Sequence, residues 1–113
     1  MRPKSDISRR GRIEGKQWAK RRATFNELDR LAELDARIGR DWASWARRED
    51  GMLALPQLMG SVPEGDHDAS AAFWRDVAGP EWELTIQDQE FVEGFVEGVL
   101  DVYAKVAGQM GHA

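Results

Sequence analysis

The chain has 113 residues and a formal net charge of −4, but the charge is divided unevenly along it. Residues 1–48 carry 14 Lys and Arg against 7 Asp and Glu, whereas residues 49–113 carry 2 against 13. The absence of cysteine excludes disulfides, thiolate metal sites and thiol nucleophiles. An asymmetry of this kind bears on partners and association rather than on fold.

The length fits one compact domain, and its five tryptophans can supply much of a hydrophobic core. These are Trp18, Trp42, Trp45, Trp74 and Trp82. No apolar run approaches the ~20 residues that cross a bilayer, and the arginines near the start precede no apolar segment of a signal peptide. We therefore expect a cytoplasmic protein that does not bind membranes.

Residues 1–12 are rich in Arg, Lys and Ser and contain few apolar side chains. Such a segment cannot bury enough surface to fold alone. The sequence predicts a flexible basic arm over residues 1–12 and a single helical domain over residues 13–113.

From Glu14 to Ile38 the apolar residues recur with the period of a helix, and we expect the first helix there. Arg21 falls within the apolar arc of this helix. Either its aliphatic stem packs along Trp18 and Phe25, or this face meets an acidic partner.

Further along the chain, Gly39 is expected to end that helix and Asp41 to cap a second one. The alternative is one long helix that continues through Gly39. A loop is predicted at residues 60–68, after which Asp68 caps a short helix that closes at Gly79-Pro80.

The alternation of polar and apolar residues over 81–86 predicts a short extended segment lying across the helices. Thr85 or Asp88 then caps the last helix, which runs to about Val106. The predicted fold is all-α, an irregular bundle of three to four helices whose first and last members form the main core.

One face of the last helix carries a row of carboxylates: Glu90, Glu93, Glu97 and Asp101. Like charges three and four residues apart oppose one another by a few tenths of a kcal/mol per pair. The row is either a solvated outer face or a docking surface for a basic partner, which includes the protein's own basic arm or that of a second copy. A metal site would need a second acidic pair on a facing helix, and the sequence shows no convincing one.

Gly94 and Gly98 lie in the same helix, where together they cost roughly 1.5–2 kcal/mol of helix propensity relative to alanine. Close approach of another backbone or of a flat Trp ring would offset this cost. We expect close packing within the chain, with a homodimer seam as the alternative.

Basic residues near the start of the chain could contact phosphates: Arg9, Arg10, Arg12, Lys16 and Lys20. Nucleic-acid binding of this kind would depend strongly on salt and little on sequence. The other interpretation is a solubilising terminus.

His67 lies between two aspartates, but the only other histidine is His112 near the end of the chain. A capping loop therefore fits His67 better than a metal site. No nucleophile motif, phosphate-binding loop or dinucleotide fingerprint is present, so we expect neither an enzyme nor a cofactor.

The sequence thus favours a small non-catalytic interaction protein that presents an acidic helical face to a basic partner, in the manner of a regulator or inhibitor. The alternative is a nucleic-acid-associated accessory protein that binds through its basic N-terminal arm.

Overall fold

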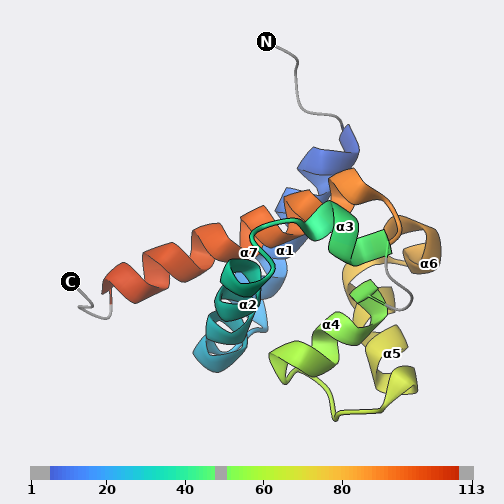
Figure 1. Cartoon of the computed structure of the whole chain (residues 1–113), viewed down its shortest axis with the longest axis horizontal. Helices are drawn as coiled ribbons and strands as arrows, with labels where there is room; N and C mark the ends of the chain where they lie inside the picture. Colours follow the sequence, from blue (N-terminus) through green and yellow to red (C-terminus); the bar gives the residue numbers. More distant parts are fainter. Residues whose placement is uncertain (1–5, 48–50, 110–113) are drawn as a thin grey trace.

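The computed structural model describes residues 6–47 and 51–109, and no strand occurs in these two ranges. The chain folds into the helices α1 (Asp6–Arg21), α2 (Phe25–Arg37), α3 (Trp42–Arg47), α4 (Gly51–Met59), α5 (His67–Ala78), α6 (Trp82–Thr85) and α7 (Gln89–Gln109) (Figure 1). The all-α prediction is confirmed, although the fold has more helices than the three to four expected.

The first predicted helix is in fact two helices, because the chain turns at residues 22–24. Thr24 caps α2: its hydroxyl accepts from the Glu27 backbone N–H at 3.2 Å, and the Glu27 carboxylate accepts from the Thr24 N–H at 2.8 Å. This reciprocal pair satisfies two donors that a helix start would otherwise leave unbonded. The expected helix over Glu14–Ile38 was wrong because the apolar periodicity continues across this cap.

The predicted flexible arm is also wrong for residues 6–12, which form the first turns of α1. Residues 1–5 lie outside the described residues. The segment is ordered by contacts that its composition does not reveal. Gly11 is buried against α7, and Arg12 forms ion pairs with the same helix.

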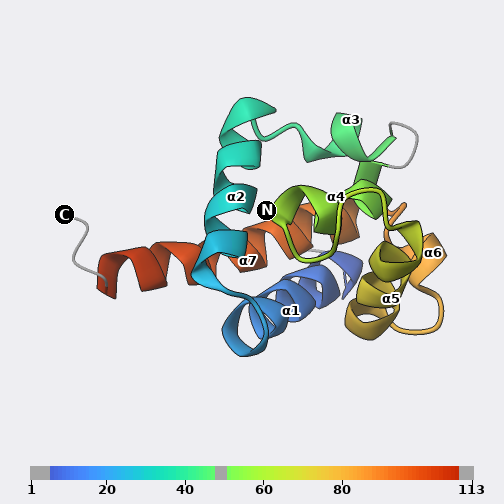
Figure 2. The ribbon, with the colours of Figure 1, turned by 90° about the horizontal axis from the view of Figure 1, so that it is seen from below.

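Helices α1 and α7 pack backbone against backbone through glycines on both helices (Figure 2). A methyl group added at Gly11 or Gly15 would meet the carbonyl of Phe91 or Phe95 at less than 3.0 Å. Gly11 lies against Phe91, and Gly15, one turn later in α1, lies against Phe95, one turn later in α7. The two helices therefore run in the same direction.

The glycines of α7 complete the contact from the other side. A methyl group at Gly94 would collide with the carbonyl of Ser8, and one at Gly98 with the carbonyl of Arg12. Only glycine allows helices to approach this closely, and the approach brings Cα hydrogens to opposing carbonyl oxygens. The structure therefore places another backbone, that of α1 in the same chain, against Gly94 and Gly98.

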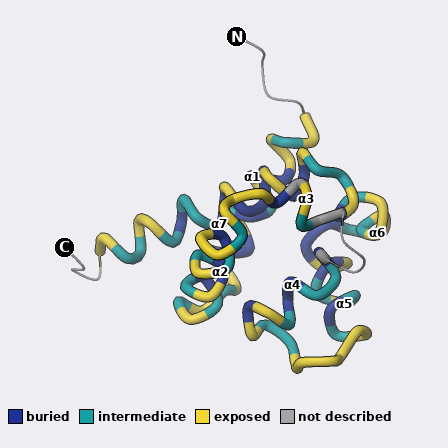
Figure 3. Tube along the Cα trace, in the orientation of Figure 1, coloured by how far each residue is buried: buried dark blue, intermediate teal, exposed yellow. Residues whose placement is uncertain are grey.

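Helices α1 to α5 and α7 all contribute buried residues, which are dark blue in Figure 3, to one apolar core. Its largest fully buried side chains include Trp74, Phe91 and Phe95. The Trp74 Nε1 donates to the Met52 carbonyl at 2.7 Å and so ties α5 to α4. This bond satisfies the one polar atom of a ring that is otherwise buried among apolar groups.

The turn between α2 and α3 has the expected break, since Gly39 and Arg40 both adopt positive φ angles, 66° and 64°. Asp41 caps α3 by accepting from the Ser44 N–H at 3.2 Å. The prediction of a helix break at Gly39 is confirmed. A positive φ is easy for glycine but uncommon for arginine.

Two local predictions in the second half need correction. Asp66, not Asp68, caps α5, because its carboxylate accepts from the Ala69 N–H at 2.9 Å. The segment 81–86 is not extended but contains the single helical turn α6. Its Leu84 is 73% exposed, so the alternating pattern does not mark a buried strand face.

Helix α7 begins after Asp88, whose carboxylate accepts from the Glu90 N–H at 2.9 Å. The helix then continues past the predicted end at Val106, through Gly108 to Gln109. Its second half is held to α2 by Tyr103, which donates to Asp29 at 2.8 Å.

We expect Gly98→Ala to lower the melting temperature by about 5 °C, because overpacking against a backbone carbonyl costs ~1–3 kcal/mol and outweighs the gain in helix propensity. Gly108→Ala is the matched control, since nothing lies within 4 Å of its added methyl group. It should leave the melting temperature unchanged or raise it slightly. Calorimetry that found equal shifts for both variants would contradict the close α1–α7 contact.

Tyr103 offers a test of the α2–α7 contact by pH. Its hydrogen bond to Asp29 raises the pKa of the phenol above the ordinary value of 10.0, with burial and the charges of Asp29 and Glu33 adding to the effect. The neutral phenol is therefore favoured in the folded state. The stability it contributes is complete below the unfolded pKa and is lost as pH rises through the folded pKa.

Tyr103 is the only tyrosine in the chain, so tyrosinate absorbance reports it alone. Asp29→Ala should lower its pKa. The midpoint of urea unfolding should also fall more steeply above pH ~10 in the native chain than in Tyr103→Phe. A tyrosine that titrates identically with and without Asp29 would show that this hydrogen bond is absent in solution.

Candidate functional site

The predicted acidic row lies along one side of α7. The side chains of Glu90, Glu93 and Glu97 are exposed, and Asp101 is partly buried. Their spacing of three and four residues places them on successive turns, as the helical period requires. The row therefore exists as a continuous feature of the fold.

The second half of this row is neutralised by α1. The Arg12 guanidinium lies 2.6 Å from the Asp101 carboxylate and 3.5 Å from that of Glu97, and the Lys16 ammonium lies 3.8 Å from Asp101. Each side chain is at least a third exposed, so each ion pair is worth only ~0–1 kcal/mol. Their main effect is to relieve the repulsion between carboxylates.

Beside the row is a groove of about 530 Å³. It is lined by Arg12, Asp35, Arg40, Trp42, Glu93, Val96, Glu97, Leu100 and Asp101. Helix α7 forms one wall, the end of α2 with the start of α3 forms the other, and Arg12 of α1 also lines the groove. Four carboxylates face two guanidinium groups, so the groove has a net negative charge.

Asp35 is the carboxylate that the sequence did not single out, and it is only 8% exposed. It accepts a hydrogen bond from the Trp42 Nε1 at 2.7 Å, and the Arg40 Nε lies 3.7 Å from its other oxygen. Both contacts satisfy a group that would be costly to bury alone. The sequence did contain a signal for this burial, because Leu28, Leu31 and Asp35 follow one another at helical spacing and are the buried residues of α2.

The five basic residues proposed for phosphate contacts do not form one free cluster. Arg12 and Lys16 face the acidic row, whereas the Arg10 guanidinium donates to the Ala78 carbonyl at 2.7 Å. Arg9 pairs with Asp6 at 3.2 Å, and Lys20 is exposed. Three of the five thus hold α1 against α7 and α5.

Within residues 6–47 and 51–109, no three His, Asp or Glu side chains gather in an arrangement that could hold a metal ion. Nor does this part of the chain contain a helix that is both long and apolar enough to cross a membrane. His67 is exposed at the start of α5, beside the capping Asp66.

Comparison with protein-family models, with curated proteins and with solved structures gave no match to this chain. A proposal about its function must therefore rest on the geometry of the groove and on its charges.

The Asp35–Trp42 bond should be essential to the shape of the groove. We expect Asp35→Ala to cost ~1–3 kcal/mol of unfolding free energy, because it leaves a buried indole N–H without a partner. In a Trp42→Phe background the same change should cost less, since no donor remains. A double-mutant cycle by urea unfolding measures the difference, and additive costs would contradict the bond.

Proposed function

We propose that the protein is a non-catalytic interaction module that binds a basic segment of a partner protein in the groove beside α7. The observation that carries this proposal is the excess of carboxylates in one groove of about 530 Å³, four against two guanidinium groups. Grooves lined by one sign of charge concentrate ligands of the other sign.

The chain itself contains an example of how a basic side chain binds here. Arg12 lies between Glu97 and Asp101, two carboxylates one helical turn apart. Glu93 is one turn before Glu97 and also lines the groove, and no cation of the described residues pairs with it. An arginine of a partner placed between Glu93 and Glu97 would repeat the Arg12 arrangement.

The end of α2 adds to the same preference. A helix C-terminus carries a partial negative charge of up to roughly half an elementary charge. In α2 this charge is reduced, because the carbonyls of Leu34, Asp35 and Ala36 accept hydrogen bonds from the following turn. Asp35 lies in the last turn of α2, so this charge and the Asp35 carboxylate act on the same wall. Binding would be electrostatically steered, fast and sensitive to salt.

The apolar residues of the groove support orientation more than affinity. Trp42 and Val96 are almost fully buried, and only Leu100 is partly exposed among the apolar lining residues. Little apolar surface remains to be covered by a partner, and affinity from its burial scales with that area. We therefore propose a partner segment whose charge, rather than its hydrophobicity, determines binding.

Nucleic-acid binding through α1 remains the alternative proposal. Its support is the excess of basic residues in α1, six against two acidic ones. Because Arg10, Arg12 and Lys16 contact groups of the same chain, a phosphate would have to displace them. This competition favours the acidic groove as the functional surface.

A charge reversal in the groove tests the proposal. We expect Glu93→Lys to weaken binding of a fluorescein-labelled oligo-arginine peptide about tenfold, measured by fluorescence anisotropy at low salt. Glu83→Lys is the matched control, because it changes the net charge equally and Glu83 is exposed on α6, outside the groove. That variant should bind within twofold of the native chain.

A peptide with citrulline in place of arginine keeps nearly the same side-chain shape but has no charge. It should not bind if charge determines binding. If Glu93→Lys and Glu83→Lys weakened binding equally, net charge alone would explain the result and the groove would have no special role. Retention of single-stranded DNA in place of the oligo-arginine peptide would favour the alternative function.

A further inference from the structure

A second recess, in which arginines outnumber carboxylates by three to two, lies where the end of α1 faces α5. It consists of two hollows. One, of about 210 Å³, is lined by Glu14, Gln17, Trp18, Arg21, Arg22, Asp76 and Val77. The other, of about 560 Å³, is lined by Arg22, Ser61, Val62, Ala69, Ala72, Phe73, Arg75 and Asp76.

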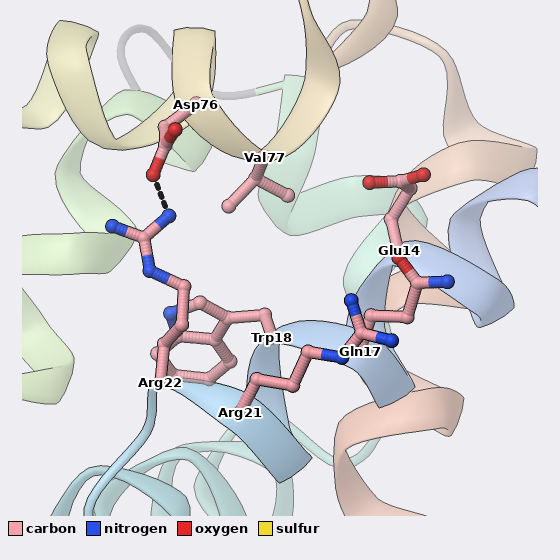
Figure 4. Close-up of a pocket in the computed structure, with 7 residues that line it drawn as sticks. All are labelled: Glu14, Gln17, Trp18, Arg21, Arg22, Asp76 and Val77. Atoms are coloured by element: carbon pink, nitrogen blue, oxygen red, sulfur yellow. Dashed lines mark ion pairs between the residues drawn. The ribbon is translucent and has the colours of Figure 1, made fainter.

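The two hollows share one ion pair. Arg22 and Asp76 line both of them and contact each other across the gap between the end of α1 and α5 (Figure 4). Both side chains are more than half exposed, so the pair is accessible to water and weak. An anion that competes with Asp76 for the Arg22 guanidinium could therefore displace it.

Each hollow also contains an arginine that forms no ion pair with any of the described residues. No carboxylate of the described residues pairs with Arg21 in the smaller hollow or with Arg75 in the larger one. Figure 4 shows the Arg21 side chain directed away from the Arg22–Asp76 pair, toward Gln17. Arg21 is also the charged residue that falls within the apolar arc of its helix, where the periodicity predicts an apolar side chain.

The floor of the recess is aromatic. Trp18 lines the smaller hollow and Phe73 the larger one, and their rings meet edge to face with centroids 5.4 Å apart. Val77 adds an aliphatic surface beside Trp18. The recess therefore offers three guanidinium groups against two carboxylates. Trp18 and Val77 are only 6% and 8% exposed, so the accessible apolar surface of its floor is mainly that of Phe73.

We propose that the two hollows form one groove that binds an acidic peptide segment in which carboxylate and apolar side chains alternate. Arg21 and Arg75 would each bind a carboxylate, for which a guanidinium is the natural bidentate partner. Arg22 would exchange Asp76 for a carboxylate of the peptide. The apolar side chains would lie over Phe73, the aromatic residue of the floor that is partly exposed.

The carboxylates within the groove select a peptide over a nucleic acid. Glu14 and Asp76 would oppose a continuous row of phosphates, whereas a peptide can place apolar residues beside them. The aromatic floor also suits aliphatic side chains. This inference is independent of the groove beside α7, which has an excess of carboxylates and shares no lining residue with the recess.

The probe is a fluorescein-labelled peptide of alternating Glu and Leu, with a peptide of Gln and Leu as its uncharged counterpart. Anisotropy at low salt should show binding of the Glu peptide only. Arg21→Ala should weaken it fivefold or more. Asp76→Asn should strengthen it two- to fivefold, because it releases Arg22 for the peptide.

Lys20→Ala is the matched control, since it removes the same charge from the adjacent position of α1 without lining either hollow. Equal losses for Lys20→Ala and Arg21→Ala would overturn the proposal, as would the absence of binding by both the native chain and Asp76→Asn. In a second measurement, the NMR signal of the Trp18 indole N–H should move on addition of the Glu peptide. An unmoved signal, or more effective competition by single-stranded DNA than by unlabelled Glu peptide, would also overturn it.

Discussion

The contact between the backbones of α1 and α7 is the constraint on which the rest of the fold depends. Glycines on both helices allow carbonyls of one helix to approach the Cα atoms of the other, and larger residues would separate the helices. The two elements come from opposite ends of the chain, so their pairing closes the domain. The parallel direction places their dipoles side by side, a small cost that close packing along several turns offsets.

This pairing also explains the uneven charge of the chain. The basic first half and the acidic second half meet where Arg12 lies against Glu97 and Asp101, so part of the asymmetry is satisfied internally. Two surfaces remain where the balance is incomplete. One is the groove beside Glu93, with four carboxylates against two guanidinium groups, and the other is the recess beside Arg21, whose two hollows together have three guanidinium groups against two carboxylates.

Much of the fold could be predicted from sequence, because helical periodicity and glycine positions are local signals. The break at Gly39 and the long last helix are of this kind. The order of residues 6–12 could not be predicted, since it depends on a partner helix some 80 positions away along the chain. The acidic row was visible as a pattern, but Asp35 and Arg40 join it only through the turn between α2 and α3.

The most direct test of this account is the nuclear Overhauser effect between the glycine α protons of α7 and the backbone amide protons of α1. The structure predicts cross-peaks from Gly94 to Arg12 and from Gly98 to Lys16, because the amide nitrogens lie close to where a side chain would begin. It also predicts slow hydrogen exchange for the middle of α1. Absent cross-peaks together with rapid exchange over residues 8–16 would show that this segment is a free arm and would contradict the account.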